Sequence, residues 1–191
     1  MKQSRIEQFD KAVNMRVKSA DAFLDYWFEH SIYTSLEYWI VVGLFLSSLI
    51  LLAIKIDKSK VFLFGFFGFS IHILTVYMNI IGINKGMWNF PIQMVPLLPA
   101  LAFDSSLVPV IFMLVFQFTF NNKKNYYLYA ILTALFISVL IEPLLVRMEI
   151  FKFYGNTTYI HRFFGYVAIS FISKFITNLF LLAQKKSIAQ Q

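Results

Sequence analysis

Two carboxylates interrupt apolar stretches of this chain, and they are the residues best placed to do chemistry. Asp104 follows a run that prolines punctuate, and Glu142 is followed directly by Pro143. In a membrane interior a carboxylate needs a charged partner or a proton, and it marks a functional site by default. Such a group could bind a proton or a cation, or serve as a general acid. We therefore place the centre of a candidate site at Asp104 and Glu142.

Four further residues are expected around this centre. His72 and Asn79 are seven positions apart, so a helix would present them on one face. Trp88 begins the proline-punctuated stretch, and Arg147 closes the apolar run that holds a carboxylate. The candidate binding residues are Asp104, Glu142, Trp88, Asn79, His72 and Arg147.

The two carboxylates are predicted to lie close together, with Arg147 or Arg162 within salt-bridge reach of one of them. Structural roles remain open as alternatives. Asp104 and the two serines after it form a good N-cap sequence for the next helix. Glu142 could be paired for purely structural reasons, and His72 could be a hydrogen-bonded packing residue.

No metal and no cofactor are expected. The chain has no cysteine, and one histidine with two carboxylates on different helices does not make a credible metal site. The sequence also contains no hydrolase elbow, phosphate-binding loop or zinc-protease motif.

The composition is that of a membrane protein. Hydrophobic residues make up 59% of the chain and charged residues only 14%, whereas about 25% of a soluble domain is charged. The lysines behind the net charge of +7 stand in short loops between apolar runs, which is typical of cytoplasmic loops. We expect the lipid bilayer as partner, with a small ion, solute or lipid as ligand or a membrane protein as further partner, and no nucleic acid.

The predicted fold is all-α, a polytopic membrane bundle of about five transmembrane helices. A span needs about 20 apolar residues, and Pro91–Phe103 is too short and too broken to cross, so we interpret it as re-entrant or partly unwound. Residues 4–30 carry apolar side chains at steps of three and four, which predicts an amphipathic helix that lies on the bilayer surface or packs on the bundle. The predicted spans are Glu37–Ile54, Val61–Ile83, Ser105–Phe120, Tyr126–Met148 and Tyr159–Leu182. The chain thus divides into a surface helix (1–34), a transmembrane bundle (35–184) and a cytoplasmic tail (185–191).

Loop charge predicts the orientation. Three basic groups share one side only if Pro91–Phe103 does not cross, and the positive-inside rule puts that side in the cytoplasm. The amino terminus would then lie outside and the carboxy terminus inside. The groups are Lys55, Lys58 and Lys60, then Lys123 and Lys124, then Lys185 and Lys186.

A set of short motifs extends over roughly residues 60–175. They are Asn79-Ile-Ile-Gly82, Gly86-Met-Trp88-Asn-Phe-Pro91, Pro96-Leu-Leu-Pro99, Asp104, Pro109-Val110, Met113-Leu114, Gln117 and Glu142-Pro143. Together they resemble a family of small multi-pass membrane proteins of spore-forming Firmicutes that has no assigned activity. The resemblance implies a multi-pass architecture in a bacterial plasma membrane and supplies no substrate. Asn79 departs from the aspartate expected there, and Tyr159–Tyr166 lacks the expected Tyr-Ser-Phe-Pro run.

Three functions are compatible with these observations. The first is a membrane protein with an outward-facing polar pocket, centred on Asp104 and Glu142 and walled by Trp88 and the proline segment, that binds or moves a small ion, solute or amphiphile. The second is an intramembrane enzyme that modifies a lipid or isoprenoid with one carboxyl as general acid. The third is a non-catalytic structural or sporulation-associated membrane subunit.

Overall fold

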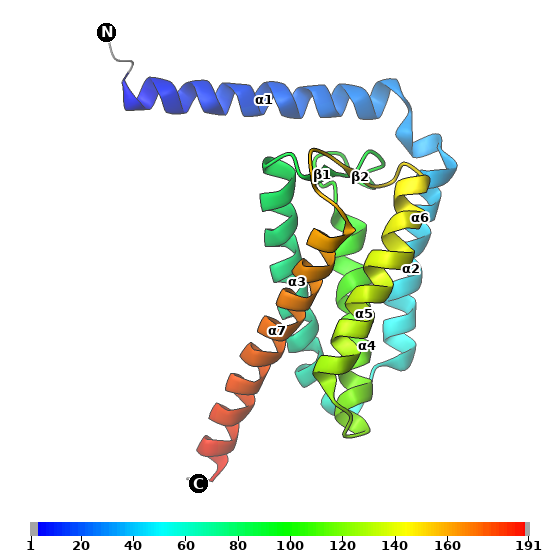
Figure 1. Ribbon diagram of the computed structural model, residues 1–191, viewed down its shortest axis with the longest axis vertical. Coiled ribbons are helices and arrows are strands. Elements are labelled where there is room, and N and C mark those ends of the chain that lie inside the picture. The colour runs from blue at the N-terminus through cyan, green and yellow to red at the C-terminus, as the bar shows by residue number, and fades with distance from the viewer. Residues whose placement is uncertain (1–3, 190–191) are drawn as a thin grey trace.

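A helix that lies crosswise over one end of an upright bundle dominates the computed structural model, which describes residues 4–189 (Figure 1). This helix, α1 (Arg5–Glu29), begins at a capping box, in which the Glu7 amide donates to the Ser4 hydroxyl over 3.2 Å and the Ser4 amide donates to the Glu7 carboxylate over 2.9 Å. Residues 1–3 and 190–191, which belong to the predicted surface segment and tail, lie outside the described residues.

The apolar stripe of α1 does not pack on the bundle along its whole length. Phe9, Val13 and Val17 are exposed, and only near its end do side chains such as Trp27 become half-buried. Of the two alternatives, packing on the bundle applies to the carboxy-terminal part of α1, where Tyr26 and Trp27 contact the membrane domain. The chain then turns into the bundle at Ser31, whose backbone is left-handed (φ 46°), and passes through η1 (Ile32–Thr34).

The prediction of five spans is confirmed. Five helical stretches are long and apolar enough to cross a membrane. They are built from α2 (Leu36–Lys55), η2 (Lys58–Lys60) with α3 (Val61–Asn84), η3 (Phe103–Leu107) with α4 (Val108–Asn121), α5 (Tyr126–Phe136) with η4 (Ile137–Ile141) and α6 (Glu142–Arg147), and α7 (Tyr159–Ile188). Their outer faces expose large apolar side chains, as expected where helices contact lipid.

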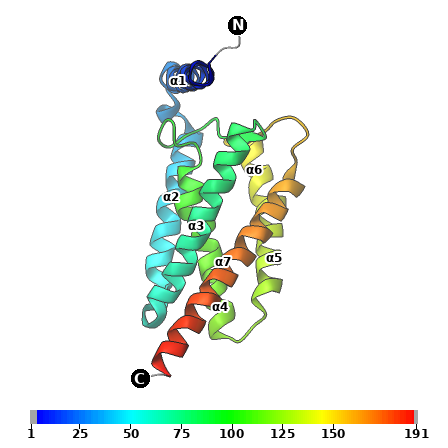
Figure 2. The same ribbon diagram turned by 90° about the vertical axis from the view of Figure 1, so that its left-hand side faces the viewer.

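The proline-punctuated segment does not cross. It runs without regular structure from Phe90 to Ala100 at the end of the bundle where α3 finishes and the next span begins (Figure 2). Pro91, Pro96 and Pro99 remove backbone donors there, which disfavours a helix. The Trp27 indole N–H donates to the Gln93 carbonyl over 2.9 Å and so fastens this segment to the end of α1.

Each of the two acidic residues lies at a turn of π-helix that precedes a proline. Asp104 belongs to η3, which is followed by Pro109, and Glu142 follows η4 and precedes Pro143. Proline cannot donate to the carbonyl four residues earlier, and its ring crowds that carbonyl. The backbone widens by one residue instead, and such π-turns often occur at functional sites.

A short antiparallel strand pair that sequence reasoning did not predict closes the same end of the bundle. Strand β1 (Trp88–Asn89) pairs antiparallel with β2 (Lys152–Phe153), with Trp88 opposite Phe153. Trp88 is only 4% exposed, so the strand pair directs its indole into the bundle. An aromatic core, which includes Phe64, Phe67, Phe112, Phe116 and Tyr166, fills the space between α3, α4 and α7.

At the opposite end of the bundle, hydrogen bonds connect the loop after α2 to the last turns of α4. The Gln117 side-chain amide donates to the Lys55 carbonyl over 2.8 Å, and Asn121 donates to the Asp57 carboxylate over 3.1 Å. Hydrogen bonds lower the pKa of the Asp57 carboxyl to about 2, and the one from the Ser59 side chain has the largest effect. The basic loops on either side of α3 and α4 therefore share one end of the bundle, as the crossing count requires.

Candidate functional site

A buried arginine organises the polar interior near the end of the bundle where β1 pairs with β2. Arg162 lies in the first turn of α7, which begins after Thr158, whose amide donates to His161 Nδ1 over 3.1 Å. Arg162 is 3% exposed, and its Nε donates to Glu142 Oε1 over 2.7 Å. The Tyr166 hydroxyl accepts from Arg162 Nη2 and donates to the same Glu142 oxygen over 2.9 Å. Arginine, tyrosine and carboxylate thus form a closed triangle between α6 and α7.

The second half of the network reaches the other carboxylate through an amide. Arg162 Nη1 and the Trp88 indole N–H both donate to Asn79 Oδ1, over 2.9 Å and 2.8 Å. Asn79 Nδ2 donates in turn to Asp104 Oδ1 over 2.6 Å. His72 Nδ1 lies 2.7 Å from the Asp104 carbonyl oxygen, which can only accept, so Nδ1 carries the proton. The two acidic residues therefore belong to one network, bridged by Asn79 and Arg162.

Aromatic rings enclose the guanidinium. The Arg162 Cζ atom lies 4.7 Å from the Trp88 ring centroid, 4.8 Å from that of Tyr166 and 5.2 Å from that of Phe151. At these distances the ring faces attract a cation, more strongly where water is excluded. The cage compensates part of the cost of burying the charge and fixes the direction in which Arg162 donates.

A very small cavity lies against the triangle. Its volume is about 20 Å³, and Glu142, Arg162 and Tyr166 line it together with apolar side chains that include Phe90 and Phe151. This is room for about one water molecule. Glu142 Oε2 is fully buried and has no hydrogen-bond partner among the described residues.

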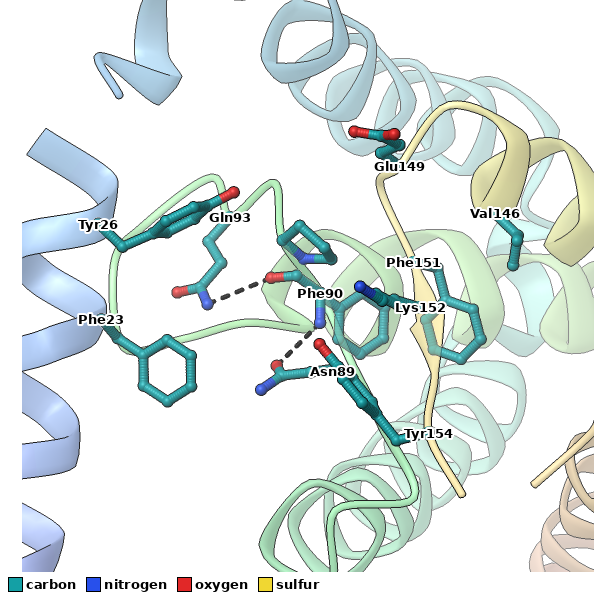
Figure 3. Close-up of a pocket in the computed structure, with 11 residues that line it drawn as sticks. Phe23, Tyr26, Asn89, Phe90, Gln93, Val146, Glu149, Phe151, Lys152 and Tyr154 are labelled. Atoms are coloured by element: carbon teal, nitrogen blue, oxygen red, sulfur yellow. Dashed lines mark hydrogen bonds between the residues drawn. The ribbon is translucent and has the colours of Figure 1, made fainter. Parts of the chain in front are cut away.

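A much larger cavity lies between α1 and the β1–β2 strand pair. Its volume is about 530 Å³, and Figure 3 shows its wall of side chains from α1, the proline segment and the strands. Phe90 and Phe151 line both cavities, and their ring centroids are 5.0 Å apart. These two rings form a partition between the open cavity and the buried ion pair. The full lining is Phe23, Tyr26, Asn89, Phe90, Pro91, Gln93, Val146, Glu149, Phe151, Lys152 and Tyr154.

Charge is present at the rim of the larger cavity. Glu149 and Lys152 both line it, and Lys152 Nζ lies 5.4 Å from the Tyr154 ring centroid. Burial, followed by the negative field of Glu149, raises the pKa of Tyr26. The tyrosine hydroxyl therefore stays a neutral hydrogen-bond donor on this wall.

The structure brings together five of the six candidate residues. Asp104, Glu142, Trp88, Asn79 and His72 all take part in the network, whereas Arg147 is exposed at the end of α6 and forms no salt bridge within residues 4–189. Of the two basic partners considered, Arg162 makes the ion pair.

Two further points correct the sequence-based interpretation. Asp104 does not act as an N-cap, because the chain is already helical at Leu101 and the Asp104 side chain is bonded to Asn79 instead. None of the six candidates lines the larger cavity, so the buried network and the open pocket are two separate places. Sequence reasoning missed Tyr166, and only its position four residues after an arginine on one helix face could have indicated it.

The five apolar spans and the sealed polar network at one end define a multi-pass membrane protein. Comparison of this chain with models of protein families, with curated proteins and with solved structures finds no match.

Proposed function

We propose that this multi-pass membrane protein binds a small amphiphilic solute in the cavity between α1 and the β1–β2 strand pair. The observation that carries the proposal is this cavity of about 530 Å³ at the end of the bundle. Pockets for small molecules generally measure about 300–1,000 Å³ and are mostly apolar with a few polar groups. The buried network then serves as the floor that holds the pocket in shape.

The lining favours an amphiphile over a bare ion. The walls are aromatic, from Phe23 and Tyr26 on α1 to Phe90, Phe151 and Tyr154 opposite. The polar groups are few, and the two charged ones, Glu149 and Lys152, have opposite signs. A ligand with an apolar body and a polar or zwitterionic head would satisfy both parts.

The position of α1 also supports an amphiphilic ligand. An amphipathic helix at right angles to a membrane bundle lies at the level of the lipid headgroups, and α1 is crosswise to the spans (Figure 1). The exposed apolar stripe, including Phe9 and Val13, would then contact lipid. The cavity beneath α1 would thus open at the depth where amphiphiles concentrate.

A structural role is the second candidate function. One observation favours it: the side chains of Asn79, Trp88, Glu142, Arg162 and Tyr166 hydrogen-bond to one another, so the polar groups largely satisfy one another. The enzymatic alternative has less support, because Phe90 and Phe151 separate Glu142 from the larger cavity, so no ligand in that cavity can reach the carboxylate in this arrangement.

Native mass spectrometry of the purified protein would test for the ligand. Val146 lines the cavity, whereas Leu144, two residues earlier on α6, is exposed. The wild-type protein and Leu144→Trp should retain a small molecule of defined mass, and Val146→Trp should lack it. The same pattern of bound molecules in all three proteins would refute the proposed pocket.

We further propose that the cavity end faces outward across a bacterial plasma membrane, with the carboxy terminus in the cytoplasm. The positive-inside rule supports this orientation, since Lys58 and Lys123 lie in loops at the opposite end. Trp88, Asp104 and Glu142, three of the residues on which the family resemblance rests, meet in one network with Asn79, which departs from the family pattern.

Single cysteines would test the orientation, because the chain has none of its own. Cysteines placed at Lys58 and Lys123 should react only from the cytoplasmic side, and one placed at Tyr154 only from outside. Labelling of all three from one side, or the reverse pattern, would contradict it.

A further inference from the structure

The buried network contains more negative than positive side chains. Asp104 comes from η3, Glu142 from α6, and Arg162 with Tyr166 from α7, and each is at most 5% exposed. His72 is the titratable residue that α3 contributes, and its Nδ1–H is directed to a backbone carbonyl. Two carboxylates thus stand against one guanidinium. If both were ionised, one buried charge would remain without a counter-charge, which is strongly unfavourable.

The hydrogen bonds show which carboxylate the arginine neutralises. Glu142 Oε1 accepts directly from Arg162 Nε and from the Tyr166 hydroxyl. The two donors show that Oε1 carries no proton, and direct contact with the guanidinium favours the ionised form of Glu142. Arg162 and Glu142 therefore form a neutral pair.

Asp104 lacks such a partner. The hydrogen bond that reaches its carboxylate comes from the uncharged amide of Asn79. Arg162 approaches Asp104 only through Asn79, to which it donates from Nη1.

We propose that Asp104 is a proton-binding site within the membrane domain and that the network holds one exchangeable proton. The protonated carboxyl makes the whole cluster electrically neutral. Glu142 Oε2, buried without a partner beside the small cavity, is a second acceptor to which the proton can be transferred when the network rearranges.

A metal cation would fit the site less well. The described residues contain no group of three or more histidine, cysteine, aspartate or glutamate side chains that could hold a metal ion. The small cavity of about 20 Å³ is lined mainly by apolar side chains, which cannot replace the oxygen ligands that hard cations require. A proton needs neither space nor a coordination shell.

Infrared spectroscopy of the full chain in lipid bilayers tests this proposal. Wild-type protein at neutral pH should show the carbonyl stretch of a protonated carboxyl group, displaced on exchange into deuterated water. Labelling aspartate with ¹³C at the carboxyl carbon should displace the band, and labelling glutamate should not. The band should be absent from Asp104→Asn and present in Asp21→Asn, whose aspartate lies exposed on α1.

Several results would overturn the assignment. A missing band in the wild-type protein, a band that responds to glutamate labelling, or a band that persists in Asp104→Asn would each do so. Thermal unfolding that depends on sodium or potassium, in the absence of the band, would assign the positive charge to a metal cation. An asparagine side chain has the shape of a protonated aspartate, so Asp104→Asn should fold, and a failure to fold would show that an ionised carboxylate is required there.

Discussion

The ion pair between Arg162 and Glu142 makes the most direct test of how this end of the bundle is stabilised. Arg162→Gln would remove donors to Glu142, Asn79 and Tyr166 together. Loss of one member of a buried pair costs about 3–5 kcal/mol, because the other member is left uncompensated. We expect Arg162→Gln to destabilise the protein at the upper end of this range, since no other cation lies in the network of described residues.

Glu142→Gln should cost less. The glutamine oxygen can still accept from Arg162 and Tyr166, and a neutral Asp104 can release its proton to supply the missing negative charge. We therefore expect about 3 kcal/mol, the lower end of the range for a broken buried pair. The same variant should lose the infrared band of the protonated aspartate.

Unfolding of each variant by increasing mole fraction of SDS, followed by tryptophan fluorescence, would give these free energies. Trp88 is a suitable reporter because its ring lies 4.7 Å from the guanidinium. The double variant of Arg162 and Glu142 should be more stable than the sum of the single losses by about 0.5–3 kcal/mol, as for residues in one network. Arg147→Gln, at an exposed position, should change the free energy of unfolding by no more than about 0.5 kcal/mol. Additive losses, or a loss for Arg147→Gln as large as that for Arg162→Gln, would refute the reasoning.

Three further predictions concern other parts of the molecule. An ideal Cβ at Gly82 would lie 2.1 Å from the Trp88 indole ring. Gly82→Ala should therefore lower the free energy of unfolding by about 1–3 kcal/mol through overpacking and red-shift the tryptophan emission. As a control, Gly43→Ala, with no atom within 4 Å of the new Cβ, should be neutral or slightly stabilising. Hydrogen bonds lower the pKa of the Asp57 carboxyl from 3.8 to about 2 in the folded protein, so its contribution to stability is complete above pH 3.8 and is lost as the pH falls through 2. A ¹³C NMR titration of this carboxyl should show a midpoint near pH 2. A midpoint near pH 4 would contradict the hydrogen bonds described. Spin labels at Phe9 and Lys11 on α1 should differ in accessibility: the label at Phe9 should contact lipid-soluble oxygen, and the label at Lys11 a water-soluble relaxation agent. Equal accessibility of the two labels would argue against a helix that lies in the membrane plane.

The spans could be predicted from the sequence because their cause is local. About 20 apolar residues between polar loops suffice to specify a transmembrane helix, and the five predicted runs match the five helical stretches to within a few residues, apart from the carboxy-terminal extension of α7. The non-crossing proline segment followed from the same local chemistry.

The arrangement of the site could be predicted only in part. The need of Glu142 for a basic partner follows from its apolar surroundings. Which arginine serves, Arg162 or Arg147, depends on the path of the segment that connects α6 to α7. The pairing of β2 with β1 fixes the path of this segment. Strands of only two residues are too short to show a periodic pattern in the sequence. Tyr166 was missed because its role lies in one hydroxyl, and by residue type alone it resembles any packing aromatic.

The paired π-turns have a consequence for how this protein can vary in length. A π-turn behaves as a single residue inserted into an α-helix. Its wider turn absorbs the extra residue, which in a regular helix would rotate the remainder by about 100°. Deleting one residue within Phe103–Leu107 would restore a regular helix and leave the rest of α4 in its present orientation. The backbone would tolerate the deletion, yet Asp104 would no longer face Asn79. Among related sequences, chains one residue shorter at this point are therefore expected to have lost the acidic residue as well, so that insertion and carboxylate are inherited as one unit.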